Sequence, residues 1–232
     1  ESGGGWVQTA KLTADDGAAR DRFGFAASIS GNHAVVGAFG DDDTGPYSGS
    51  AYIFEKSGAT WTQVAKLTEG DDAAEHRRFG ESASISGDRV VVSAPHADYI
   101  GSGPPGAAYI FEKFGATWTR VAKIRPNDTV FEDAFGREVS LSGDHLIIGS
   151  FRDDDNGEDS GSAYIYDMNQ IFDSDNDGVP DGWDACPDTP GGTITDAEGC
   201  ALTPGDCDGD GDVDALDLKI MAENYGSTDS VE

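Results

Sequence analysis

Two Asp-rich segments in the last quarter of the sequence space their carboxylates as a calcium site requires. In the first, residues 173–184, carboxylates occupy loop positions 1, 3, 5, 9 and 12, and Gly178 at position 6 permits the tight turn. Five anions within twelve residues repel one another strongly without a hard cation. The expected Ca²⁺ ligands are the side chains of Asp173, Asp175, Asp177, Asp181 and Asp184 and the backbone carbonyl of Val179.

The second segment, residues 206–217, repeats this spacing around Gly211. Apolar residues over 216–225 then fit the pattern of a short helix. Asp212 stands at the position that contributes a backbone carbonyl. The expected ligands of this second Ca²⁺ are Asp206, Asp208, Asp210, Asp212, Asp214 and Asp217.

The first loop has the spacing of an EF-hand-like loop, with Asp184 where an EF-hand has Glu. Together with the Cys-Pro-Asp and Gly-Cys that follow, residues 169–202 resemble a thrombospondin type 3 calcium repeat. This resemblance implies a disulfide between Cys186 and Cys200. Cys207 is left over, and it is either free or paired between subunits.

Residues 203–232, with the second loop, resemble one half of a type I dockerin. Dockerins pair two such loops to bind cohesin, and because the sequence holds only one, we do not expect cohesin binding. Extracellular calcium sites are commonly weak, at about 10⁻⁴ to 10⁻³ M, and stay filled. We therefore expect Ca²⁺ to rigidify the tail rather than to act as a regulated switch.

Composition restricts the compartment and the partners. The 232 residues include 44 acidic and 15 basic side chains, for a formal net charge of -29, which disfavours nucleic acid and anionic membranes as partners. No run of 18 apolar residues could span a bilayer. The sequence opens at Glu1 rather than Met, as expected of a mature product, and its cysteines cluster in the tail. We expect an extracellular protein, secreted or associated with the cell surface.

An internal repeat organises the first 166 residues. A segment of the type Trp-x-Gln/Arg-x-Ala-Lys-Leu/Ile, called here the Trp segment, begins at Trp6, Trp61 and Trp118. Phe-Gly pairs recur every 56 residues, at 23–24, 79–80 and 135–136, and three β-type apolar runs follow each pair. With the Trp segment, each unit therefore has the pattern of four short strands.

Four strands every 55 to 57 residues is the period of a propeller blade, because one small sheet must stack on neighbours to bury both faces. Residues 6–166 resemble the FG-GAP repeats of integrin-like β-propellers, which implies a radial stack of blades. We expect a mostly β fold in which residues 1–168 form three four-stranded blades, open or completed by another subunit. A small calcium-binding, disulfide-stapled tail follows.

The phase of the strands leaves one Trp segment unassigned. Short turns at 56–60 and 113–117 join the third strand of a unit to the next Trp segment, which is therefore the outer strand of the same blade. The third unit runs into the tail without one, while residues 6–12 form a spare strand ahead of the first unit. Propellers typically close with about four to eight blades.

Two explanations remain open for the spare strand. The favoured one is that the strand at 6–12 of one subunit completes the third blade of another, giving a fibre or a closed oligomer. The other is that the sequence belongs to a longer chain that holds the missing blades.

Nothing in the sequence nominates a catalytic centre. No pair of histidines or cysteines has zinc-ligand spacing, and no serine lies in a nucleophile elbow. We therefore do not expect an enzyme. The histidines without such spacing are His33, His76, His96 and His145.

Other conspicuous residues of the repeats have simpler explanations. The Asp runs at 41–43 and 153–155 lack alternating spacing, so solvated turns are favoured over metal sites. The tryptophans could stack on sugars, but their equivalent placement in each unit favours packing.

These observations favour an extracellular, calcium-binding structural or adhesive protein that self-assembles by strand exchange, with other copies of itself as partners. The alternatives are the non-catalytic attachment region of a larger secreted carbohydrate-active enzyme, and a glycan-binding adhesin that recognises cell-surface or matrix polysaccharide.

Negative-stain electron microscopy with mass analysis, in calcium and after EGTA, separates these possibilities. We expect fibres or rings that fall apart on chelation, because calcium neutralises the acidic loops. Stable monomers in both conditions would instead indicate a fragment of a larger secreted binding protein or enzyme.

Overall fold

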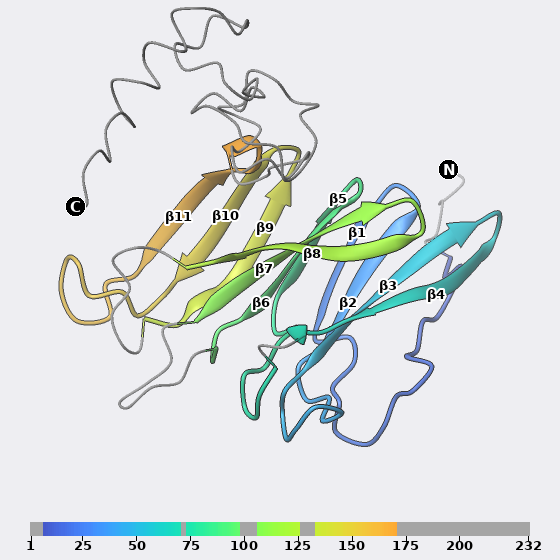
Figure 1. The fold of residues 1–232 in the computed structure, drawn as a ribbon, viewed down its shortest axis with the longest axis horizontal. Helices are drawn as coiled ribbons and strands as arrows, with labels where there is room; N and C mark the ends of the chain where they lie inside the picture. Colours follow the sequence, from blue (N-terminus) through green and yellow to red (C-terminus); the bar gives the residue numbers. More distant parts are fainter. Residues whose placement is uncertain (1–6, 71–72, 98–105, 126–132, 171–232) are drawn as a thin grey trace, which may run out of the picture. The chain divides into compact units, whose positions relative to one another are not determined.

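The computed structural model describes residues 7–70, 73–97, 106–125 and 133–170. Within residues 1–168, which form one compact unit, three antiparallel sheets lie side by side with the second between the other two (Figure 1). In the described part of the chain the helical residues belong to 3₁₀ turns, at Gly70 and in η2 (Met168–Gln170), and no helix there could cross a membrane. The mostly β prediction is confirmed.

The first two sheets each contain four strands in chain order, as the repeat pattern predicts. Short turns join the first strand to the second and the third to the fourth, whereas longer loops join the second to the third. A β-bulge interrupts each outer pairing at the same place, between Ile53 and Phe54 and between Ile110 and Phe111. Blade one comprises β1 (Ala26–Ser30), β2 (His33–Ala38), β3 (Ser50–Ser57) and β4 (Thr60–Leu67). Blade two comprises β5 (Ala83–Ser86), β6 (Arg89–Ala94), β7 (Ala107–Phe114) and β8 (Thr117–Ile124).

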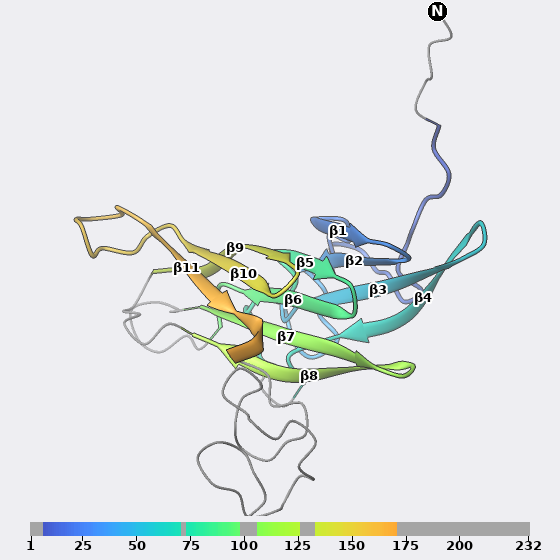
Figure 2. The same cartoon turned by 90° about the horizontal axis from the view of Figure 1, so that it is seen from above.

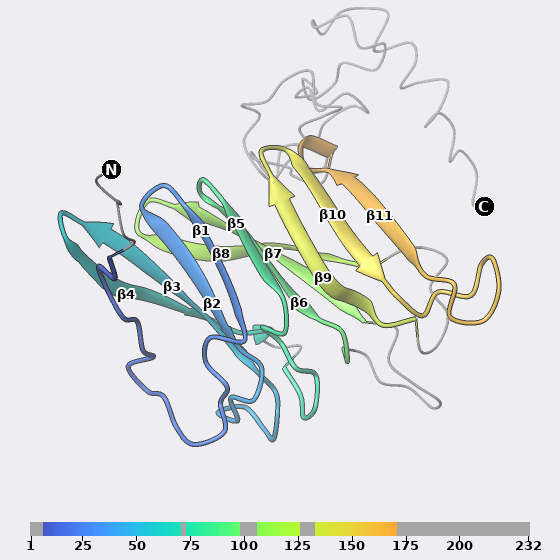
Figure 3. The same cartoon turned by 180° about the vertical axis from the view of Figure 1, so that it is seen from behind.

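The third sheet has three strands among the described residues, in the order β11-β10-β9. Its outer strand β11 pairs only with β10 there, so the position that β4 and β8 hold in the other sheets has no described strand (Figure 3). Blade three comprises β9 (Phe135–Ser142), β10 (His145–Ser150) and β11 (Ser162–Asp167).

The blades bury both faces of their sheets by stacking. The second strand of each blade carries apolar side chains on both faces of its sheet. The core cluster between blades one and two is formed by one face of blade one and one face of blade two. Val35 and Ile53 come from what we call the trailing face of blade one. Ile85, Val90 and Val92 come from the leading face of blade two. All five are at most 4% exposed, so this interface is a true core.

The recurring Phe-Gly pair fixes the distance between blades. Gly49, just before β3, makes an isolated parallel bridge to Phe79, and Gly106 makes the same bridge to Phe135. A Cβ on Gly106 would lie 2.0 Å from the carbonyl oxygen of Phe135, so only glycine admits this approach. The ring of Phe79 then packs edge-on against Tyr109, with centroids 5.6 Å apart.

Serine hydroxyls link the first strands of neighbouring blades, β1, β5 and β9, which we call the inner strands and which lie side by side in Figure 2. Side chains on β1 and β5 and just before β5 accept hydrogen bonds from backbone N–H groups at or just beyond the next inner strand, at 3.0–3.3 Å. In each of these bonds the donor lies 57 residues after the acceptor in the sequence. The bonds therefore set the register in which the blades stack. The accepting side chains are Ser28, Ser30, Ser82, Ser84 and Ser86. The donors are the N–H groups of Ile85, Gly87, Val139, Leu141 and Gly143.

The described residues of the N-terminal Trp segment form no strand within the chain. Residues 7–12 lie outside every sheet, and residues 7–11 are exposed. Leu12 and Ala14 nevertheless pack on the leading face of blade one, against the cluster that contains Tyr52 and Phe54. Leu12, near the end of this segment, therefore contacts blade one in the way that Leu67, at the end of β4, contacts blade two.

We expect Gly106→Ala to destabilise the protein by about 3 kcal/mol or more, because its Cβ would collide with the Phe135 carbonyl at a residue with φ of +87°. Urea unfolding followed by tryptophan fluorescence measures the change. Gly58→Ala is the matched control: its φ is +60° but its Cβ meets nothing, so about 1 kcal/mol is expected. Equal losses in both variants would contradict the role assigned to the close approach.

Candidate functional site at the open ends of the blade stack

The leading face of blade one is open at its inner strand. Ile29 of β1 is 65% exposed, whereas its repeat equivalents Ile85 and Leu141 are 4% and 6% exposed. The three residues have the same place in their strands and differ only in whether a preceding blade covers them. Among the described residues, therefore, this face lacks the neighbour that the other two blades have.

The trailing face of blade three is open at the opposite end of the stack. Ile165 of β11 is 73% exposed, and its equivalents Ile53 and Ile110 are fully buried. Ile147 of β10 is 43% exposed, whereas Val35 at the same position is fully buried. Because trailing faces pack on leading faces inside the chain, the two open faces are of complementary types.

A carboxylate socket lies at the edge of blade one. The hydroxyl of Tyr52 donates a 2.7 Å hydrogen bond to Oδ2 of the buried Asp41. Lys66 of β4 places its ammonium 3.0 Å from the same oxygen and 2.6 Å from Asp16, and it also contacts Asp43. Oxygens of the three carboxylates lie within 4.8 Å of one another, so the ammonium takes the place that a bound cation would take.

These contacts shift the ionisation of the socket residues. Burial opposes the charge on Lys66, but the hydrogen bonds that its ammonium donates to Asp16, Asp43 and Asp41 outweigh it and raise the lysine pKa. The hydrogen bond to Lys66 lowers the pKa of Asp16. Burial, and next the hydrogen bond to Asp41, raise the pKa of Tyr52. Lys66 is therefore a permanent internal counter-ion at neutral pH.

Blade three repeats the acidic half of this socket. Tyr164 donates a 2.7 Å hydrogen bond to Asp153, whose exposure is 4%, and the tyrosine hydroxyl lowers the pKa of that carboxyl. The N–H of Asp155 donates to Asp153 Oδ1, as the N–H of Asp43 does to Asp41. The described part of blade three holds no lysine at the place of Lys66.

The described part of blade two contains the cationic half but not the buried carboxylate. Ala97 occupies the loop position of Asp41, with the same backbone hydrogen bond to the end of the second strand. Lys123 of β8 still lies over the ring of Tyr109, 5.3 Å from the centroid, and Lys66 lies at the same distance over Tyr52. The lysine–tyrosine contact is therefore common to both four-stranded blades.

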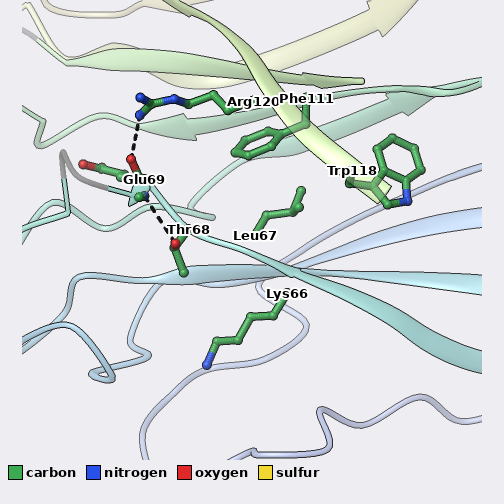
Figure 4. A pocket seen from close by; sticks show the side chains of 8 residues that line it. Lys66, Leu67, Thr68, Glu69, Phe111, Trp118 and Arg120 are labelled. Carbon is green, nitrogen blue, oxygen red and sulfur yellow. Dashed lines mark hydrogen bonds between the residues drawn. The ribbon is translucent and has the colours of Figure 1, made fainter. Parts of the chain in front are cut away.

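A cavity of about 310 Å³ opens between the end of β4 and the outer strands of blade two (Figure 4). In Figure 4 the Arg120 guanidinium reaches the carbonyl oxygen of Glu69, at 2.6 Å. No histidine, cysteine or serine lines the cavity. The lining residues are Lys66, Leu67, Thr68, Glu69, Gly70, Phe111, Trp118 and Arg120.

The expected calcium and disulfide residues lie outside the described residues, so those assignments stay predictions. They are the twelve loop positions from Asp173 to Asp184 and from Asp206 to Asp217, together with Cys186 and Cys200.

The blade loops correct one expectation in part. The sequence favours solvated turns for both Asp runs, and the second and third Asp of each run are exposed, but the first, Asp41 and Asp153, are only 3% and 4% exposed and each accepts a tyrosine hydrogen bond. Sequence reasoning also missed Lys66 as the partner of Asp41. The signal was present, since the Trp segments carry a lysine at the same position, as Lys11, Lys66 and Lys123.

The remaining sequence expectations concern packing and zinc. Trp118 is 8% exposed in the core between the blades, and Trp61 packs against the blade one cluster, as expected. His33 lies beside Glu55 and Asp88 at the junction of blades one and two. Among the described residues, the single group of potential metal ligands is Asp16, Asp41 and Asp43, which contains no histidine.

Comparison with known families agrees with this architecture. The model of the FG-GAP repeat matches residues 6–54, 61–111 and 118–166, which together exceed half of the chain. No curated protein matches the sequence.

We expect Lys66→Met to lower the free energy of unfolding at pH 7 by about 2 kcal/mol, because the buried Asp41 loses a charged hydrogen bond. The hydrogen bond from Lys66 holds the pKa of Asp16 below its ordinary value of 3.8, so the part of the stability that comes from the Asp16–Lys66 pair exists above that pH and is lost as the pH falls through the folded-state pKa. The deficit of the variant should therefore shrink as the pH falls below 3.8.

Chemical unfolding at pH 7 and about pH 3 measures this dependence. Lys56→Met, at an exposed lysine of the same sheet, is the control and should change stability by less than about 0.5 kcal/mol. A deficit of equal size at both pH values would contradict the charged role of Lys66.

Proposed function

Because the chain belongs to the FG-GAP repeat family, we propose that it is an extracellular, calcium-binding structural or adhesive protein that assembles end to end with other copies of itself. Repeats of this family are generally non-catalytic.

The observation that carries the proposal is the contrast between equivalent isoleucines. Ile29 and Ile165 are 65% and 73% exposed at the two ends, while Ile85 and Ile53 are 4% and 0% exposed inside the stack. Burying a large aliphatic side chain contributes about 1.5–3 kcal/mol. Stacking a further blade on each end would recover this contribution several times over.

The two ends differ, so the contact between copies is head to tail. A leading face meets a trailing face, and a contact of this kind forms a ring if the rotation closes and a fibre if it does not. The net charge of -29 opposes close association of copies, and calcium bound by the tail loops would reduce that repulsion.

A second candidate rests on the same open faces. If the sequence is part of a longer chain, further blades of that chain would cover Ile29 and Ile165, and the protein would be the attachment region of a larger secreted carbohydrate-active enzyme. The mass of the native protein distinguishes the two, because the first requires an intact chain of 24.2 kDa.

We expect Ile165→Lys to reduce self-association at least about tenfold, because a charge would be buried in the contact between copies. Sedimentation velocity in calcium over a concentration series measures the effect. Phe114→Lys is the control, because Phe114 is 52% exposed at a hairpin tip away from the end faces, and it should associate like the wild type. Loss of association in both variants would point to non-specific hydrophobic contact.

Deletion of residues 1–12 tests the strand-exchange part of the proposal. The shortened chain should not form the assembly, since the Trp segment that completes blade three would be missing. An unchanged oligomer after the deletion would rule out strand exchange while leaving stacking of the faces possible.

A further inference from the structure

In both four-stranded blades, one lysine pairs with one tyrosine across the outer strands. The register places Lys66 opposite Tyr52 and Lys123 opposite Tyr109. Each ammonium lies 5.3 Å from the centre of the ring. The tyrosines are fully buried, so the outer strand completes their burial.

Blade three presents the receiving half of this pair at its outer edge. Tyr164 of β11 occupies the position of Tyr52 but is only half-buried, whereas Tyr52 is fully buried. It holds Asp153 by the same 2.7 Å hydrogen bond that Tyr52 makes to Asp41. Asp155, exposed beside it, corresponds to the Asp43 that contacts Lys66.

The N-terminal Trp segment presents the donating half. Lys11 follows Trp6 by five residues, as Lys66 follows Trp61. It is exposed on a segment that belongs to no sheet. Blade three therefore has two carboxylates beside a tyrosine. The described part of the Trp segment has a lysine and pairs with no strand of its own chain.

Among the described residues, the two halves cannot meet within one copy. Leu67 pairs with Ala51 of blade one while packing in the core shared with blade two. Leu12, its equivalent, packs on the leading face of blade one, so its partner strand must belong to a blade that precedes blade one. Blade three of the same chain lies beyond blade two, on the far side of the stack (Figure 1).

We propose that residues 6–12 of one copy form the fourth strand of blade three in the next copy, with Lys11 seated on Tyr164 between Asp153 and Asp155. This inference rests on the proposed self-assembly and specifies its register. By the register of β3 and β4, Lys11 pairs with Tyr164, Ala10 with Ile165 and Leu12 with Ala163. Ile165 is then buried as Ile53 is.

The other contacts between blades continue across the same junction. Ser140 and Ser142 are the equivalents of Ser84 and Ser86, whose hydroxyls accept N–H groups of the following blade. Gly161 holds the loop position of Gly106, with the same hydrogen bond back to its loop. When two copies associate in this way, the edge of β11, the serine hydroxyls of the inner strand and the Phe-Gly contact therefore all gain their partners together.

A charge exchange tests the pairing in the full-length protein. Lys11→Asp and Asp155→Lys should each weaken assembly about tenfold or more, because each places like charges together. An equimolar mixture of the two variants should assemble like the wild type. At alternate junctions the introduced aspartate would meet the introduced lysine, and at the others the native Lys11 would meet the native Asp155. Sedimentation velocity in calcium gives the oligomer fraction.

The matched controls are Thr9→Asp, at the bulge position of the same segment, and Asn156→Lys, exposed in the same loop as Asp155. Both should assemble like the wild type, and their mixture should add nothing. Wild-type assembly that persists in both Lys11→Asp and Asp155→Lys would overturn the Lys11 docking and leave the proposed self-assembly intact. A monomeric wild-type protein would overturn both.

A disulfide between chains gives an independent measure of register. Mixing Ala10→Cys protein with Ile165→Cys protein under mild oxidation should yield a linked pair, identified by mass spectrometry of the joined peptides. Ala10→Cys mixed with Phe114→Cys should yield none. A link formed equally in both mixtures, or in neither despite assembly, would contradict the register.

Discussion

The structure depends on a constraint common to small β-sheets: a sheet that is apolar on both faces is not stable alone. In β2, Val35 and Val36 point to opposite sides and both are buried, one against blade two and one toward the N-terminal segment. A polar outer face would have allowed a blade to end the stack. Because each blade has apolar residues on both faces, each needs a neighbour on each side.

The spacing that satisfies this need is set by the backbone. Gly49 and Gly106 let the Phe-Gly turn of the next blade approach within the distance of a strand bridge. The phenylalanine ring then fills the space beside the buried tyrosine. Stacking of side chains alone tolerates sliding, whereas these bridges and the serine hydroxyls permit one register.

The chain has far fewer basic than acidic side chains, and several of the basic side chains form ion pairs between different segments. Lys66 contacts three carboxylates, of which Asp16 comes from the segment before blade one. Lys113 bridges to Glu55 and Arg89 bridges to Asp144, each across a junction of two blades. Exposed pairs of this type contribute little stability, but they penalise wrong registers because mismatched acidic groups repel.

The sequence by itself determined the repeat, the strands and the order of the sheets, because alternation, Gly turns and the Phe-Gly pairs act over a few residues. The sequence also showed that one Trp segment precedes the first unit and none follows the third, because the order of the repeats can be read directly from it. It did not indicate that Asp41 meets Lys66, which depends on a bulge between Ile53 and Phe54 that aligns the two strands.

Only the tertiary structure decided which equivalent residues are covered. Ile29 and Ile85 lie in nearly identical strands, yet one is 65% exposed and the other 4%. Their sequences could not distinguish them, because the burial of a residue depends on the blade that lies against it and not on its own strand.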